Sequence, residues 1–138
     1  MDFLLLDSPI DAAALRERLL APGAGGFVCF EGWVRDHNEG RAVLSLSYSS
    51  YPALANREGL RILEEAHGRF GIVGATCAHR VGDLAVGAMA VWVGVSAAHR
   101  GAAFEACRWI IDEVKSRVPI WKNERYADGG GQWLHPPA

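Results

Sequence analysis

One segment in the middle of the chain alternates between large and small side chains with a period of two residues. Leu44, Leu46 and Tyr48 are each followed by a serine. Because successive side chains of a β-strand point to opposite faces, this pattern predicts a strand with one buried face and one face in water. The fold must therefore contain a sheet that is covered on that side.

Around this strand the sequence predicts helices and strands in mixed order. Helices are expected at residues 8–20, 52–70 and 97–117, and further strands at residues 3–6, 27–35, 73–81, 89–96, 120–122 and 133–134. Ser96 would cap the last helix and Pro119 would end it. In the second helix, Leu60, Leu63 and His67 would follow one side. This order favours an α+β fold with mixed sheets and three helices over a doubly wound parallel sheet.

Length and composition limit the class of protein. The chain has 138 residues, of which half are hydrophobic and 22% are charged, as is typical of one globular domain spanning residues 1–138. The formal net charge is −2, so no nucleic-acid-binding surface of excess positive charge is expected. No apolar stretch reaches the roughly 18 residues of a membrane span, and the first residues lack the basic start of a secretory signal. We therefore expect a cytoplasmic protein.

The cysteines and histidines do not have the spacing of a metal site. The three cysteines form no CxxC pair, and the five histidines form no HxxxH or HExxH pair. Buried free thiols are the simpler interpretation of Cys29, Cys77 and Cys107. Neither a zinc site nor a dithiol redox centre is expected.

Lysine is rare in this chain. Of fourteen basic residues only two, Lys115 and Lys122, are lysines. A lysine that is desolvated or close to other cations loses its proton more easily, whereas arginine stays charged. Lys115 falls at the edge of the apolar face of the last helix. There, a lysine either extends its ammonium into water or serves as an acid, base or nucleophile, and its position alone leaves both interpretations open.

Three further residues add positive charge at the ends of predicted elements. Arg35 ends a strand before a polar loop, and His99 and Arg100 stand at the start of the last helix. A helix start favours anions because its backbone N–H groups are unpaired, and arginine binds phosphate or carboxylate with two donors. Each residue is also compatible with an ordinary exposed position. Together with the two lysines they indicate a pocket for an anionic small molecule, and their spacing does not identify the substrate.

Several motifs also follow one another in a characteristic order. They occupy residues 30–38 (FEGWVRDHN), 51–52 (YP), 79–82 (HRVG), 96–100 (SAAHR), 103–104 (AF) and 119–124 (PIWKNE). In this combination, from about residue 27 to residue 133, the chain resembles the large, catalytic subunit of molybdopterin synthase. The resemblance implies an α/β-hammerhead fold and an enzyme of molybdenum cofactor biosynthesis.

The same resemblance implies a reaction and its partners. The family forms a homodimer with a small ubiquitin-like subunit docked at each end, which makes a heterotetramer. The small sulfur-carrier subunit ends in Gly-Gly with a thiocarboxylate. As a sulfurtransferase, the family adds two sulfurs to cyclic pyranopterin monophosphate and so forms the dithiolene of molybdopterin. No metal or dissociable cofactor is implied for this subunit, and neither nucleic acid nor membrane is a partner.

Roles for three site residues near the end of the chain follow from the resemblance. Lys115 matches the key active-site lysine of the family. Its implied role is proton transfer during sulfur transfer and opening of the cyclic phosphate, and transient acyl chemistry at this lysine is the lesser alternative. Lys122 matches the second lysine, which would hold the terminal thiocarboxylate or the pterin. Glu124 matches the acid that follows this lysine and would orient it.

The resemblance also assigns substrate-binding roles to four residues outside this segment. Arg35, His99 and Arg100 match the basic residues of the substrate pocket and would hold the cyclic phosphate. Phe30 would line the path of the small subunit's tail. In a dimer, His99 and Arg100 are expected to reach the partner's Lys115.

Two functions of other classes compete with this interpretation. One is a non-catalytic module that binds anions through the same basic cluster and serves in regulation or as a scaffold. The other is a phosphate-ester hydrolase acting alone, which is disfavoured because the sequence shows neither metal ligands nor a nucleophile–base motif.

Overall fold

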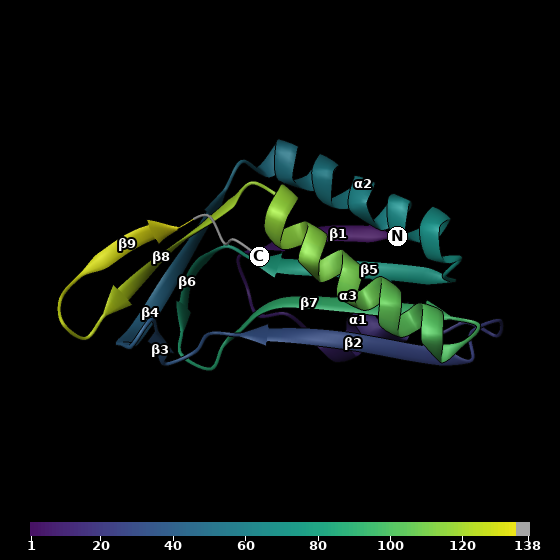
Figure 1. The fold of residues 1–138 in the computed structure, drawn as a ribbon, viewed down its shortest axis with the longest axis horizontal. Helices are drawn as coiled ribbons and strands as arrows, with labels where there is room; N and C mark the ends of the chain where they lie inside the picture. Colours follow the sequence, from purple (N-terminus) through teal and green to yellow (C-terminus); the bar gives the residue numbers. More distant parts are fainter. Residues whose placement is uncertain (135–138) are drawn as a thin grey trace.

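In the computed structural model, which describes residues 1–134, the chain forms two β-sheets and three helices (Figure 1). The elements in chain order are β1 (Asp2–Leu6), α1 (Ala12–Glu17), β2 (Gly26–Trp33), β3 (His37–Asn38), β4 (Arg41–Ser50), α2 (Pro52–Phe70), β5 (Gly74–Arg80), β6 (Gly82–Ala85), β7 (Met89–Ala97), α3 (Arg100–Arg117), β8 (Ile120–Tyr126) and β9 (Gly131–Leu134). The expected domain over residues 1–138 includes residues 135–138, which lie outside this described part.

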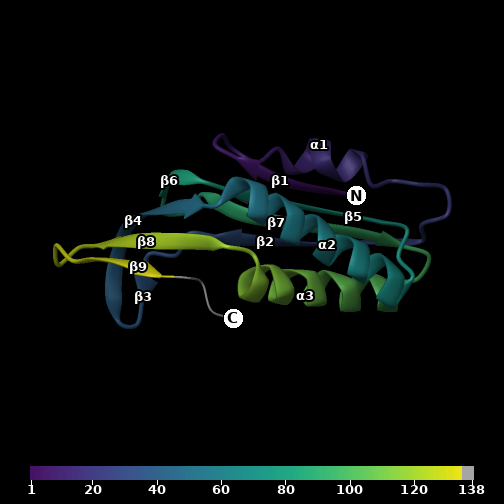
Figure 2. The ribbon, with the colours of Figure 1, turned by 90° about the horizontal axis from the view of Figure 1, so that it is seen from above.

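The first sheet has four strands in the order β1-β5-β7-β2. β1 runs parallel to β5, and the other pairs are antiparallel. Helices α2 and α3 pack on one face of this sheet, and α1 lies on the opposite face (Figure 2). Because both faces are covered, the middle strands β5 and β7 are almost entirely buried.

The second sheet is built around β4. It pairs antiparallel with β8, which in turn pairs antiparallel with β9. The other edge of β4 pairs with two short strands, β3 and β6, that the sequence pattern did not predict. Figure 1 shows this sheet at one end of the first, close to the last turn of α3. The short link from α3 to β8 thus connects a helix that packs on the first sheet to a strand of the second sheet.

Helix α3 buries one continuous face against the first sheet. The buried residues are Ala103, Ala106, Cys107, Ile110, Ile111 and Val114, at the spacing of three and four residues that a helix requires. The helix begins at Arg100 with His99 as its N-cap, so the predicted start at residue 97 with Ser96 as the cap is wrong. Ser96 instead lies in β7 opposite Phe27, because the ladder between β7 and β2 continues to Ala97.

Helix α1 is shorter than predicted. The side chain of Asp11 accepts a hydrogen bond from the backbone N of Ala14 at 3.1 Å and caps the helix there. The predicted helix at residues 8–20 therefore shrinks to Ala12–Glu17.

Helix α2 has the predicted bounds but buries a different face. Pro52 occupies its first turn, and Gly71 ends it in the left-handed region at φ 63°. Its buried residues are Ala55, Gly59, Ile62, Leu63 and Ala66. Leu60 and His67 are exposed, so the predicted apolar line through them is wrong, and only Leu63 belongs to the buried face.

A bulge changes the predicted alternation of β4. Between Val43 and Ser45 the pairing with β8 shifts, which leaves Leu44 as the extra residue. Leu44 is 62% exposed, whereas Val43 and Leu46 are buried. The prediction that Leu44 shares a buried face with Leu46 is therefore wrong at that end of the strand.

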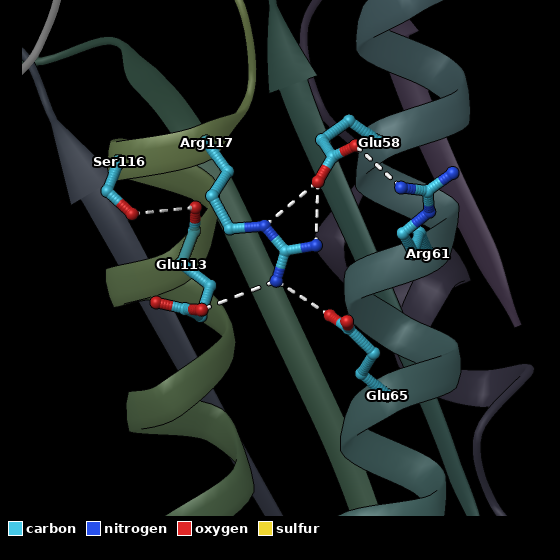
Figure 3. Close-up of polar contacts among 6 residues, drawn as sticks. All are labelled: Glu58, Arg61, Glu65, Glu113, Ser116 and Arg117. Atoms are coloured by element: carbon cyan, nitrogen blue, oxygen red, sulfur yellow. Dashed lines mark hydrogen bonds and ion pairs between the residues drawn. The ribbon is translucent and has the colours of Figure 1, made fainter.

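A cluster of charged side chains joins α2 to the last turn of α3 (Figure 3). The guanidinium of Arg117 donates to Glu58 at 2.6 Å and to Glu65 at 2.6 Å, both on α2. It also donates to Glu113, one turn earlier on its own helix, at 3.3 Å. These carboxylates raise the pKa of Arg117 above its usual value, although partial burial opposes them. The cluster fixes the end of α3 against α2.

The observed elements confirm the α+β fold with mixed sheets and three helices, in the α/β-hammerhead arrangement. Within residues 1–134, no helix is both long and apolar enough to cross a membrane.

Candidate active site

A cavity of about 520 Å³ lies between the two sheets beside the last turns of α3. Its polar lining includes Arg35, Tyr48, His79, Lys115, Lys122 and Glu124. Apolar residues complete the wall, among them Val34, Leu46, Val91, Val114 and Ile120. Of the seven site residues predicted from sequence, five line this cavity: Phe30, Arg35, Lys115, Lys122 and Glu124.

Lys122 and Glu124 form an ion pair on one face of β8. They are two residues apart in a strand, so their side chains point the same way. Nζ of Lys122 lies 3.0 Å from Oε1 of Glu124, and Asn38 donates to the other carboxylate oxygen at 2.9 Å. Burial raises the pKa of Glu124, but hydrogen bonds from Lys122, Tyr126 and Asn38 outweigh it and hold that pKa below its usual value. Glu124 is thus an ionised carboxylate that fixes the ammonium of Lys122.

Lys115 reaches the same cavity from the last turn of α3. Within residues 1–134, its ammonium has no hydrogen bond or ion pair. Partial burial lowers its pKa, and the positive charges of Lys122 and Arg35 lower it further, while Asp112 acts in the opposite direction. The neutral amine is therefore easier to form at Lys115 than at an isolated lysine, as a group that donates and accepts protons requires.

Strand β2 supplies Phe30 and, just beyond its end, Arg35. The pairing of β2 with β7 shifts between Gly32 and Trp33. A Cβ atom at Gly32 would lie 2.6 Å from Cγ1 of Val91, so the close approach of these strands requires glycine. Arg35 is exposed, and in the described part of the chain it has no ion-pair partner. Its guanidinium is therefore available to an anion in the cavity.

Tyr48 and His79 are cavity residues to which sequence analysis assigned no function. Tyr48 comes from β4 of the second sheet and His79 from β5 of the first, and their rings meet edge to face at 4.8 Å between centroids. Burial raises the pKa of Tyr48 to about 12, and the charge of Glu124 adds to this effect. The only sequence signal for His79 is its place at the start of the 79–82 motif.

His99 and Arg100 do not line this cavity. They lie at the start of α3, whereas Lys115 lies fifteen residues further along, in its last turn. At 1.5 Å per residue the two ends are about 22 Å apart. One chain therefore does not bring these residues to Lys115, and their role in substrate binding stays a prediction.

The residues that do meet can bind an anion and move a proton. Arg35 offers a planar pair of donors, Lys122 is held in place by Glu124, and Lys115 has a lowered pKa. Among residues 1–134, no group of three or more His, Cys, Asp or Glu side chains is arranged to hold a metal ion.

Comparison with known proteins identifies relatives of the whole fold. The family model described as "MoaE protein" matches residues 5–117. A molybdopterin synthase catalytic subunit of Pyrococcus abyssi is 53% identical over 110 residues, covering 80% of this chain and 74% of that protein. A protein of the same name from Thermoplasma volcanium is 39% identical over 129 residues, covering 94% of each.

Solved structures share the same architecture. Molybdopterin synthase from Staphylococcus aureus superposes with a TM-score of 0.88 at 30% identity, covering 96% of this chain and 95% of that one. A complex of subunits 1 and 2 of molybdopterin-converting factor from Helicobacter pylori gives a TM-score of 0.76 at 24% identity, covering 91% of this chain and 86% of that one. By the family model, which matches most of its length, and by these relatives, the chain belongs to the MoaE protein family.

Proposed function

We propose that this chain is the catalytic subunit of a molybdopterin synthase and transfers sulfur to cyclic pyranopterin monophosphate. The observation that carries this proposal is the cavity in which Lys115, Lys122 and Arg35 meet. A cyclic phosphate and a thiocarboxylate are both anions, and a lysine of lowered pKa can move the protons that sulfur transfer requires. The names of the relatives, and membership of the family, support the same reaction.

Each lysine has a separate task in this proposal. Lys115 transfers protons while the new carbon–sulfur bonds form and the cyclic phosphate opens. Lys122 holds the thiocarboxylate or the pterin, and its fixed position depends on the ion pair with Glu124. Arg35 binds the phosphate of the substrate.

The sulfur donor in this proposal is a small partner subunit whose C-terminal Gly-Gly carries the thiocarboxylate. Phe30, 39% exposed at the cavity, would lie along the path of that tail. The Helicobacter pylori structure, a complex of two subunits of molybdopterin-converting factor, supports a two-subunit assembly.

We further propose that the active form is a homodimer carrying two small subunits. About 22 Å of helix separates His99 and Arg100 from Lys115 of their own chain, so they do not serve the cavity of that chain. In the dimer they would instead reach the cavity of the other copy. The cytoplasm is proposed as the location on the basis of the biosynthetic role alone.

Reconstitution tests this function. The purified chain is mixed with a thiocarboxylated small subunit and cyclic pyranopterin monophosphate, and dithiolene product is measured for the wild type and for Lys115→Ala. Product from the wild type and almost none from the variant is the expected result. Precursor binding without turnover by the wild type would instead favour the anion-binding module, and turnover without the small subunit would favour a hydrolase.

A further inference from the structure

The imidazole of His79 is a buried polar group in the cavity wall that the proposed reaction does not use. The residue is only 7% exposed, yet it lines the cavity together with Lys115. Its strand, β5, lies in the middle of the first sheet, and its ring contacts Tyr48 of the second sheet. His79 therefore sits where the two sheets meet at the cavity.

The hydrogen bonding of this ring determines which nitrogen carries the proton. Nδ1 of His79 lies 2.8 Å from the carbonyl oxygen of Arg80, and a carbonyl only accepts hydrogen bonds. Nδ1 is therefore the donor, and Nε2 of the neutral ring carries a lone pair. The edge-to-face contact with Tyr48 holds the ring in this orientation.

Nε2 is open to the cavity. Within residues 1–134, Nε2 has no hydrogen-bond partner. Among these residues, the side-chain atoms that are both fully buried and without a partner are Nε of Arg80, Oγ of Ser96 and Oδ1 of Asn123, so Nε2 of His79 keeps some accessible surface. Because the residue is nearly buried and lines this cavity, the cavity is where a partner for Nε2 would bind.

The ring stays neutral at physiological pH. Burial, helped by the nearby charge of Lys115, lowers the pKa of His79 to about 4, although the hydrogen bond to Arg80 acts in the opposite direction. A neutral ring with Nδ1 protonated can only accept at Nε2. The cavity therefore combines cationic groups with one fixed neutral acceptor.

We propose that His79 is a specificity-determining residue whose Nε2 accepts a hydrogen bond from a ring N–H of the bound substrate. This inference rests on the proposed function, because a reduced pterin carries ring N–H donors as well as a phosphate. With the phosphate bound by Arg35 as proposed above, the heterocycle would lie along the apolar wall beside Tyr48, a wall that His79 shares. A phosphate ester without an N–H donor leaves the lone pair of His79 unpaired and is rejected for that reason.

Two substitutions distinguish the role of Nε2 of His79 from the role of its Nδ1. His79→Gln places an amide oxygen near the position of Nε2 and loses the bond to Arg80. His79→Asn keeps a donor near the position of Nδ1 and loses the acceptor. We expect His79→Asn to weaken binding of cyclic pyranopterin monophosphate about tenfold, which corresponds to about 1.4 kcal/mol, and His79→Gln to weaken it clearly less.

The controls test the fold and the anion site separately. His67→Asn, at an exposed histidine of α2, serves as the matched control and keeps the affinity of the wild type. Inorganic phosphate is titrated as a second ligand, and both His79 variants are expected to bind it like the wild type. Dissociation constants are measured without turnover, so they remain interpretable even where the reconstituted chain makes no product.

Several outcomes would overturn the inference. Weaker binding by His79→Gln than by His79→Asn would assign the role of the ring to its bond with Arg80, which is structural. If His79→Asn left the affinity unchanged but displaced the pH profile of turnover, the ring would act on the ionisation of Lys115 and not on the binding of the pterin.

A measurement on the unmodified protein avoids variants that fail to fold. In protein with ¹⁵N-labelled histidine, the Nε2 resonance of His79 is expected to move upfield when cyclic pyranopterin monophosphate is added. Phosphate alone should leave it in place. No movement with the pterin would reject the hydrogen bond.

Discussion

Nζ of Lys122 lies 3.0 Å from Oε1 of Glu124, and this ion pair between a partly exposed lysine and a buried glutamate lines the cavity. Asn38 donates to the second carboxylate oxygen at 2.9 Å, so both oxygens of Glu124 are engaged. The ammonium of Lys122 is consequently fixed before any ligand arrives, whereas that of Lys115 has no such partner among residues 1–134.

Replacing Glu124 should change the dependence of stability on pH. Because the pKa of Glu124 is lowered in the folded protein, its carboxylate stabilises the fold above the unfolded-state pKa. This contribution is lost as the pH falls through the folded-state pKa. Glu124→Gln is expected to reduce the free energy of unfolding by about 1–3 kcal/mol at neutral pH, and the deficit should shrink in acid. Urea midpoints across this pH range measure it, with exposed Glu105→Gln as the control; a deficit independent of pH would contradict the prediction.

Removing Arg35 should raise the pKa of Lys115. Burial is the largest cause of the lowered value, but the charge of Arg35 also contributes, and its loss makes the ammonium easier to keep. Since the chain has only two lysines, ¹³C-methylated side chains give two resolvable lysine signals for a titration by NMR. Arg35→Gln should raise the measured pKa of Lys115. Arg108→Gln, at an exposed residue on the same helix as Lys115, should leave that pKa unchanged.

Charge alone should not replace Lys115. Arginine keeps the positive charge but does not release its proton at physiological pH. Lys115→Arg is therefore expected to reduce product formation by at least about a hundredfold, the usual contribution of a proton-transferring side chain. Single-turnover product yield measures this loss, and calorimetry with inorganic phosphate tests whether anion binding survives. Turnover close to wild type would mean that Lys115 acts only as a charge.

A mixture of two inactive variants should regain activity if the site is shared between chains. In a mixed dimer of His99→Ala and Lys115→Ala chains, one of the two cavities has both residues intact. Half of randomly exchanged dimers are mixed, so recovery to about one quarter of wild-type product formation is expected. Absence of recovery after verified chain exchange would place all essential groups in one chain.

The charged cluster around Arg117 should stabilise the fold more than an exposed pair on the same helix. Arg117 contacts three carboxylates and is 27% exposed, whereas the Arg108–Asp112 pair is 3.9 Å apart and largely exposed. Arg117→Met is expected to cost about 2 kcal/mol of unfolding free energy, after allowance for solvent screening, and Arg108→Met less than about 0.5 kcal/mol. Urea unfolding of both variants measures the difference; equal effects would show that the cluster contributes no more than a surface pair.

Local spacing predicted only part of the site. Lys115 lies at the edge of a helical apolar face, as the period of the helix indicated. Glu124 was assigned by the family resemblance alone, because the predicted strand ended at residue 122, whereas β8 continues to Tyr126 and so places Glu124 on the same face as Lys122.

What sequence missed depends on contacts between elements. His79 reaches the cavity because the first sheet meets Tyr48 of the second, and no local pattern encodes that contact. The bulge that exposes Leu44 arises from the register between β4 and β8. Likewise, the expectation that Ser96 caps α3 failed because pairing of β7 with β2 took precedence over the intrinsic capping preference of serine.

The charged cluster around Arg117, which fixes the last turn of α3 against α2, has a consequence for building hybrid enzymes from related proteins. The segment from Arg100 to Tyr126 contains α3 and β8, and it sets the relative position of Lys115 and Lys122. A one-residue insertion within the helix would turn Lys115 by about 100° around the axis and advance it by about 1.5 Å. Such a hybrid must therefore exchange this segment as one block, together with Glu58 and Glu65, the residues on α2 to which Arg117 is anchored.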